Sequence, residues 1–295
     1  MVRRDPGRNL TVILAGGRGD FYDQQYPDVE GEGMGFRSDG ADLIQEWKSD
    51  RETAGSSYKY LTSGQELQDF TDYSVDHLMG LFAIEDMEYH LEQTPEMDDP
   101  TLALMTEKAL AVLSTKPGGY VVFIEAGLVD HGHHGNKARQ AVDETLQLDA
   151  AVTKALEMVD TEETLVIVTA DHSHAMTING YPDRGNDIFG LGGHGSDGLY
   201  YSTIMYGTGP GYKQPGSNGD RYDITQDDMT YEAYRFMAAA PESSSDHAGE
   251  DVTVYAVGPQ SHLFRGLYQQ NYIPHVLAYA ACIGDGAQFC EDQNS

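Results

Sequence analysis

The sequence is poor in basic residues and lacks long hydrophobic runs. Only 18 of its 295 residues are lysine or arginine, against 48 aspartates and glutamates, so the formal net charge is −30. Nucleic-acid affinity comes mostly from lysine and arginine that neutralise phosphates, and this charge therefore argues against a nucleic-acid-binding protein. No apolar run reaches the ~20 residues of a membrane-spanning helix. A substrate that contains phosphate would need positive charge from bound cations.

Cysteine is also scarce, because only Cys282 and Cys290 occur, both in ACIGDGAQFCEDQ near the end. From the residues alone, a local disulfide and two buried thiols both remain open. The first residues, MVRRDPGRNLTVILAGG, contain an apolar segment too short for a secretory signal. The last residues, FCEDQNS, lack the hydrophobic tail of a lipid-anchor signal. We therefore expect neither signal in this sequence.

Apolar runs alternate with helical patterns along the chain. LTVILAGG predicts a buried strand, while ADLIQEWKSDRE and DPTLALMTEKALAVLS predict helices. GGYVVFIEAG, residues 118–127, has the pattern of a strand buried on both faces. An amphipathic helix is predicted over residues 141–159, followed by a second buried strand in ETLVIVTADHSH, residues 163–174. Strand, helix and strand at this spacing indicate a βαβ unit with two parallel strands, and hence an α/β fold.

The later part of the chain changes in composition. Residues 181–246 are rich in glycine, aspartate, serine and tyrosine, which predicts a loop-rich insertion with short strands such as YYSTIMYG. Order then resumes in the strand pattern EDVTVYAVG and the helix pattern YIPHVLAYAACI. We predict one domain over residues 1–295 that contains this insertion.

Acidic residues and histidines follow both strands of the predicted βαβ unit. Glu125 and Asp130 come after the first strand, and Asp171, His172 and His174 come after the second. Ligands of parallel α/β sheets bind beyond the carboxyl ends of the strands. If the two strands are neighbours, these side chains share one edge of the sheet.

Their chemistry suits divalent cations. Asp130 and His134 are four residues apart, so a helix there would place them on one face, and His247 lies beside another strand pattern. Oxygen and nitrogen ligands together suit Zn²⁺, and the carboxylate of Glu125 suits Mg²⁺. Taken singly, Glu125 could be a buried paired acid and His247 a surface histidine. Their joint placement beside predicted strands favours a multinuclear metal site.

At these residues the sequence resembles the animal alkaline phosphatases. The matching blocks are FIEAGLVDHGHHGNKARQA, TLVIVTADHSHAMTINGYPDRGNDIFG, MYGTGPGY and HAGEDVTVYAVGPQSHLFRG, and RSDGADLIQEW and HLMGLFAIEDMEYHLE extend the likeness toward the beginning. The resemblance implies a mostly parallel sheet sandwiched by helices, and hydrolysis of phosphate monoesters through a phosphoserine intermediate.

The resemblance also implies roles for individual residues. Asp130, His134 and His247 resemble the ligands of a first zinc, Asp171 and His172 resemble part of a second zinc site, and Glu125 resembles a magnesium ligand. His131 resembles a residue that contacts phosphate, and His174 resembles a histidine that orients an acidic ligand. Tyr181 resembles a residue that reaches across a homodimer, and Cys282 and Cys290 resemble a disulfide-bonded pair. We therefore expect two zinc ions and one magnesium ion. Gln25 and Ala83 stand where vertebrate relatives have acidic calcium ligands, and Asp98 or Asp99 could supply one carboxylate, so a calcium site is doubtful.

Part of the family pattern is missing. The aspartate-serine-alanine motif with the nucleophile, a bridging aspartate and the phosphate-clamping arginine do not occur in this sequence. Ser173 lies between two histidines, but a structural role suits it better. The chain resembles the C-terminal part of the family, and an inactive truncated surface or binding protein is the alternative. A related metal hydrolase that acts on sulfate esters or diesters fits the motifs less well.

Family members are commonly anchored outside the cell by lipid. The resemblance therefore implies an extracellular or cell-surface protein, with membrane contact only through a lipid anchor whose signal this sequence lacks. The expected partners are phosphate monoesters and a second copy of the full-length chain.

Overall fold

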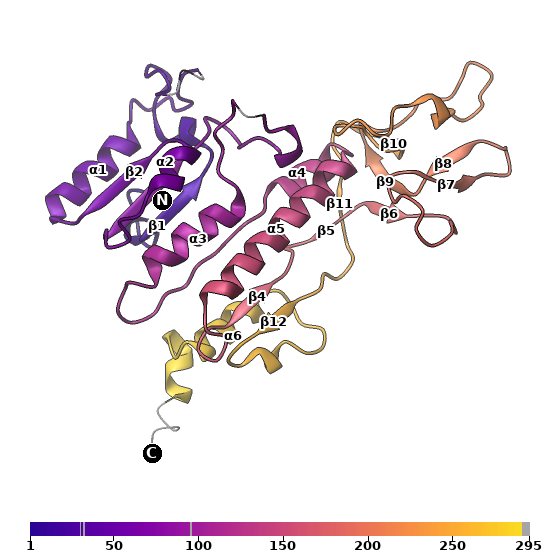
Figure 1. Ribbon diagram of the computed structural model, residues 1–295. Helices are drawn as coiled ribbons and strands as arrows, with labels where there is room; N and C mark the ends of the chain where they lie inside the picture. Colours follow the sequence, from indigo (N-terminus) through magenta and orange to yellow (C-terminus); the bar gives the residue numbers. More distant parts are fainter. Residues whose placement is uncertain (30, 32, 95, 291–295) are drawn as a thin grey trace. The chain divides into compact units, whose positions relative to one another are not determined.

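The computed structural model describes residues 1–29, 31, 33–94 and 96–290, which form two compact units. Unit 1 consists of Met1–Gly132 and Arg139–Ala155, and unit 2 of His133–Ala138 and Leu156–Ser295. Figure 1 shows the elements of both units in sequence colours. The boundary falls within helix α4 (Leu128–His134), and most of helix α5 (Ala138–Met158) belongs to unit 1.

Unit 1 contains a parallel sheet and the helices that cover it (Figure 1). Besides α4 and α5, its elements are β1 (Val12–Ala15), α1 (Leu43–Ala54), β2 (Tyr58–Leu61), α2 (Gly64–Asp69), β3 (His77–Leu81) and α3 (Leu102–Leu113), with short 3-10 helices at Gly7–Asn9, Arg18–Phe21 and His90–Glu92. The strand order is β1-β3-β2, with β3 in the centre.

The two faces of this sheet bury different sets of apolar residues. On one face Met79 of β3 packs with Ile44 and Trp47 of α1. On the other face Leu78 packs with residues of α2 and α3, including Val112. Because successive strand residues point to opposite faces, an apolar strand such as β3 needs helices on both sides. The predicted α/β sandwich of a parallel sheet between helices is confirmed in this unit.

Local signals fix where the helices of unit 1 begin and end. The Asp42 carboxylate accepts a hydrogen bond from the backbone N–H of Gln45 at 2.9 Å, so α1 begins at Leu43. Gly55, with φ of 69°, ends α1 in the left-handed conformation that glycine adopts without strain. Thr101 starts α3 in the same way that Asp42 starts α1.

A buried ion pair ties the loop after β1 to the end of β3. Nε and Nη2 of Arg18 donate to the two carboxylate oxygens of Asp28 at 2.7 and 2.9 Å, and both side chains are 0% exposed. Nη1 of Arg18 donates to the carbonyl of Leu81 at 2.8 Å, and Tyr22 donates its hydroxyl to Asp28. The buried charges are thus paired and hydrogen-bonded, as burial requires.

The predicted strand over residues 118–127 is wrong. No strand forms between residues 118 and 127, and the side chains of Val121 and Phe123 are 68% and 89% exposed. The predicted parallel pairing with the strand in 163–174 is wrong as well, because β4 (Val166–Val168) pairs antiparallel with β12 (Tyr255–Val257). An apolar run becomes a buried strand only where neighbouring strands accept its backbone hydrogen bonds, and local composition cannot supply them.

Unit 2 consists of small sheets (Figure 1). Besides β4 and β12, its elements are β5 (Ser173–His174), β6 (Met176–Ile178), β7 (Leu191–His194), β8 (Tyr200–Ser202), β9 (Ile204–Gly209), β10 (Ala238–Pro241), β11 (His247–Ala248) and α6 (Tyr272–Ala280), with 3-10 helices at Ile224–Gln226, Ser261–Leu263 and Gly284–Phe289. β9 pairs parallel with β10 and antiparallel with β6, while β5 pairs antiparallel with β11.

The core of unit 2 packs around β9. Tyr206 and Ile204 are buried there with Phe236 and Ala138. Asn136, buried and with φ of 56°, donates through Nδ2 to the carbonyl of Thr208 and accepts from the N–H of Gly211. The turn after α4 is thereby held against the end of β9.

The segment after helix α6 contains the disulfide that the family resemblance implied. Cys282 and Cys290 are bonded, and their Cα atoms lie 5.9 Å apart. Among the described residues, no helix is both long enough and apolar enough to cross a bilayer.

Candidate metal centre

Four histidine rings from three segments of unit 2 gather in one place. The rings of His172 and His247 stack with centroids 3.5 Å apart. The centroids of His134 and His174 lie 4.8 Å apart, and those of His174 and His247 lie 5.0 Å apart. Imidazole nitrogens are common metal ligands, so four adjacent rings form a candidate metal site.

Short elements of secondary structure hold these rings together. His174 of β5 and His247 of β11 are direct partners across an antiparallel ladder. His134 is the last residue of α4, and its carbonyl oxygen accepts from the N–H of Ser245 at 2.9 Å. The cluster therefore depends on long-range backbone pairing between α4, β5 and the segment before β11.

The hydrogen bonds of His134 set its tautomer. Its Nδ1 lies 2.6 Å from the carbonyl oxygen of Ser245, which can only accept, so Nδ1 bears the proton. In the neutral ring of this tautomer Nε2 carries the lone pair, and it lies 3.2 Å from Nε2 of His247. Two nitrogen ligands about 2.0–2.1 Å from a tetrahedral zinc ion are about 3.3 Å apart. The separation of these nitrogens therefore fits a shared zinc ion.

Helix α4 also carries Asp130. Asp130 and His134 are one turn apart on this continuous helix, as the spacing predicted. Within unit 2, ligand atoms of His172, His174 and His247 lie within 4.8 Å of one another. Several neighbouring imidazoles form a donor set that suits zinc.

The other predicted site residues are arranged differently. The Asp171 side chain is 82% exposed, with its carboxylate 3.3 Å from Nε2 of His172. Glu125 is exposed within the segment that forms no strand. Nδ1 of His131 lies 3.3 Å from the Asp86 carboxylate. Tyr181 is fully exposed. Of the predicted ligands in unit 2, His134, His172, His174 and His247 are brought together, and the Asp171 carboxylate lies beside His172.

Two neighbours of the cluster were not predicted from the sequence. Nδ1 of His133 lies 2.9 Å from the hydroxyl of Tyr206, and its ring centroid is 5.1 Å from that of His174. Burial raises the pKa of Tyr206 well above its ordinary value, so the phenol stays protonated. His133 lies within the DHGHH run, but nothing in the sequence indicated a tyrosine 73 positions later.

Ser173 is engaged beside the cluster. Its hydroxyl donates to the Glu250 carboxylate at 2.7 Å, which helps to hold the pKa of Glu250 below its ordinary value. A serine that donates to a carboxylate and has no imidazole base on its oxygen lacks the arrangement of an activated nucleophile. This agrees with the structural role predicted for it.

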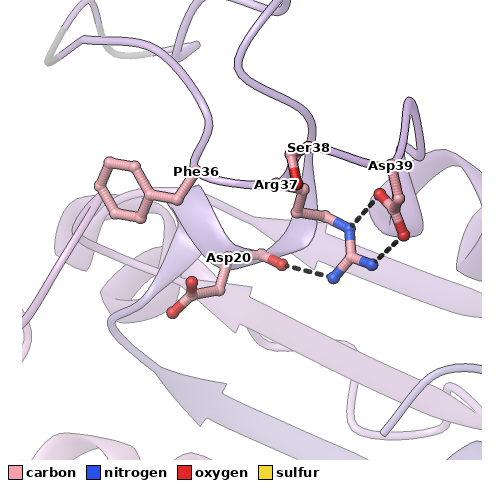
Figure 2. A pocket seen from close by; sticks show the side chains of 5 residues that line it. All are labelled: Asp20, Phe36, Arg37, Ser38 and Asp39. Atoms are coloured by element: carbon pink, nitrogen blue, oxygen red, sulfur yellow. Dashed lines mark hydrogen bonds and ion pairs between the residues drawn. The ribbon is translucent and has the colours of Figure 1, made fainter.

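A hollow of about 340 Å³ in unit 1 is a weaker candidate for a phosphate site (Figure 2). It is lined by Asp20, Phe36, Arg37, Ser38 and Asp39. Nε of Arg37 donates to the Asp39 carboxylate at 3.0 Å, and Nη1 donates to the carbonyl of Asp20 at 3.2 Å. With its guanidinium bound to an acid and the Asp20 carboxylate nearby, this hollow offers little attraction to an anion.

An α/β sandwich and a histidine-rich candidate metal site define the class as an α/β protein with a possible site for divalent cations. Residues 4–283 match the model of the alkaline phosphatase family. The sequence is 42% identical over 294 residues to the tissue-nonspecific alkaline phosphatase of Felis catus, covering 98% of this chain and 55% of that protein. It is 41% identical to the membrane-bound alkaline phosphatase of Bombyx mori, covering 98% and 52%. The chain belongs to the alkaline phosphatase family.

The fold has solved counterparts. The alkaline phosphatase of the Antarctic bacterium TAB5 is similar with a TM-score of 0.55 and 20% identity, over 92% of this chain and 60% of that one. A variant of that enzyme with magnesium bound gives a TM-score of 0.59 at 20% identity, over 93% and 61%. These likenesses confirm the fold class. The chain spans about half the length of the relatives that it matches by sequence.

Proposed function

We propose that this chain supplies the metal centre of an enzyme that hydrolyses phosphate monoesters. Family membership supports the reaction, and the cluster of four histidines in unit 2 supports the metal dependence. The observation that carries the proposal is the 3.2 Å separation of the Nε2 atoms of His134 and His247. The net charge of −30 adds to it, because an anionic substrate needs cations in such a protein.

In this proposal each ligand has a stated task. Asp130, His134 and His247 bind one zinc, Asp171 and His172 contribute to a second, and Glu125 binds magnesium. When bound, the ions supply Lewis-acid stabilisation of charge on the phosphoryl oxygens. His174 orients its neighbours, and His131 contacts phosphate. Calcium is not part of the proposal.

The setting is proposed on the same basis. Relatives include a membrane-bound enzyme, and the bonded pair Cys282 and Cys290 suits an oxidising compartment. We infer a cell-surface or extracellular protein that works as a homodimer, with Tyr181 near the partner.

The test is turnover of an aryl phosphate by this chain joined to the N-terminal portion of the Bombyx mori relative. Turnover should require zinc and fall to background in His247→Ala. The matched control is His262→Ala, which removes an exposed histidine outside the cluster and should keep turnover within about 2-fold. Equal turnover in both variants contradicts the proposed centre.

A second function, metal binding without catalysis, is favoured by the Ser173 hydroxyl, which donates to the Glu250 carboxylate. Measurements on the chain alone and on the joined protein together separate the two functions. Zinc bound at one or two equivalents, with no turnover in either protein, supports the binding function.

A further inference from the structure

We propose that Thr208 and Asp246 form a clasp that positions His247 for metal binding. The clasp is a reciprocal pair of hydrogen bonds at the end of β9. The Thr208 hydroxyl donates to Oδ2 of Asp246 at 3.0 Å and accepts from the backbone N–H of Asp246 at 3.0 Å. Neither residue was among those predicted to serve the site. The inference rests on the proposed metal centre.

Asp246 stands between the two strands that carry ligands. It directly precedes His247, and its carbonyl oxygen accepts from the N–H of Ala175, the residue after His174. The pairing of β5 with β11 involves only two residues from each strand. So short a ladder is marginal by itself, and added bonds at its end must fix its register.

The segment that the clasp restrains would otherwise be a loop. Residues 242–246, between β10 and β11, have the sequence ESSSD, which has no apolar side chain to anchor it. Ser245 fastens this segment to His134, and the clasp fastens it to β9. β9 is itself central in its sheet and buried around Tyr206. Thr208 therefore connects the exposed His247 to a rigid element, which preorganises a ligand.

Loss of the clasp should reduce the affinity for metal more than it reduces the stability of the fold. Partners that orient a metal ligand without touching the metal are worth about 10–100-fold in affinity. Thr208→Val removes both hydrogen bonds of the hydroxyl and keeps the side-chain shape. Thr208→Ser keeps the hydroxyl and should rescue the function.

The test uses the full chain with zinc and a competing chromophoric chelator. Thr208→Val should weaken zinc binding by about 10-fold or more, and Thr208→Ser by less than about 3-fold. The visible spectrum of bound cobalt, which reports ligand geometry, should change in Thr208→Val only. The control is Thr177→Val in β6, where the hydroxyl donates to Met205 away from the cluster. Thermal unfolding of the metal-free chains measures how much each substitution lowers the stability of the fold itself.

Each outcome decides the question. If Thr208→Val binds zinc as tightly as the unaltered chain or as Thr177→Val, the proposed role of the clasp is wrong, while the proposed metal centre still stands. No zinc binding by the unaltered chain overturns the metal centre together with the clasp. Weakened affinity and an altered cobalt spectrum, restored in Thr208→Ser, support it.

A separate observation points to a modification site in unit 1. We infer that Asn9 accepts an N-linked oligosaccharide. Asn9, Leu10 and Thr11 form the Asn-x-Thr acceptor pattern, with no proline in the middle. Asn9 and Leu10 are exposed at the end of a 3-10 helix, before β1 begins at Val12. The Asn9 amide donates to the exposed Asp5 carboxylate at 2.7 Å, a surface contact that a glycan can replace.

This inference rests on the proposed extracellular setting, and its test imposes that setting. The chain is expressed in mammalian cells behind a cleavable secretion leader, and its mass is measured in medium and in lysate before and after removal of N-glycans by peptide N-glycosidase. A mass loss of one oligosaccharide is expected, absent in Asn9→Gln and in Thr11→Ala and kept in Thr11→Ser. If the chain carries no glycan in either medium or lysate, the inference about Asn9 is wrong, and the proposed metal centre is unaffected.

Discussion

The Nε2 atoms of His134 and His247 lie 3.2 Å apart, although 113 positions separate the two residues in the sequence. This contact depends on three different elements, because α4, β5 and β11 must each hold its place. A zinc ion between the nitrogens would tie these elements together. Metal binding should therefore be coupled to the stability of unit 2.

The first prediction concerns that coupling. Zinc at 100 times its dissociation constant should stabilise the chain by about 2.7 kcal/mol, measured as a shift in the thermal unfolding midpoint that a chelator reverses. His247→Ala should lose most of this shift, and its zinc affinity should fall about 100-fold or more, beyond the effect of losing an orienting partner. His262→Ala should behave like the unaltered chain. A zinc-dependent shift of the same size in all three chains would place the metal elsewhere.

The second prediction concerns the buried ion pair of Arg18 with Asp28. Arg18→Met leaves the Asp28 carboxylate buried beside an apolar side chain, and should reduce the free energy of unfolding by about 3–5 kcal/mol. Arg37→Met removes a partly exposed ion pair with Asp39 and should cost less than about 1 kcal/mol. Denaturant unfolding of both variants measures the difference. An equal loss in the free energy of unfolding for both variants would show that burial of the Arg18–Asp28 pair does not increase the cost of removing one partner.

The third prediction is a pH dependence at Asp227. Burial alone would raise its pKa, but hydrogen bonds from Lys213, Tyr222 and Tyr234 outweigh burial and lower the pKa below its ordinary value. An acid with a lowered folded-state pKa stabilises the protein above its unfolded pKa, and this contribution is lost as the pH falls through the folded pKa.

Asp227→Asn should therefore cost about 1–2 kcal/mol at pH 7, and the cost should shrink as the pH falls below about 4. The exposed Asp251→Asn variant serves as the control and should change the free energy of unfolding little at either pH. A cost for Asp227→Asn that stays constant across this range would mean that its charge is irrelevant.

The sequence predicted local features well, for reasons visible at single residues. The limits of α1 follow from Asp42 and Gly55, and the shared face of Asp130 and His134 follows from helical spacing. Convergence of the histidines was predicted from two adjacent parallel strands, yet the structure achieves it through the antiparallel pairing of His174 with His247. The clasp between Thr208 and Asp246 had no sequence signal, because a hydroxyl and a carboxylate 38 positions apart occur in almost any chain.

The failed strand prediction at residues 118–127 leads to the fourth prediction. Hydrophobicity indicated burial, but Phe123 is 89% exposed and Val121 is 68% exposed. Phe123→Ser should therefore change the free energy of unfolding by no more than about 0.5 kcal/mol, and should reduce self-association in sedimentation experiments because an exposed apolar segment is removed. The matched control is Phe236→Ser, which truncates a fully buried ring in unit 2 and should cost about 3–5 kcal/mol. If Phe123→Ser destabilised the chain as much as Phe236→Ser, the segment would be packed in solution and the original strand prediction would stand.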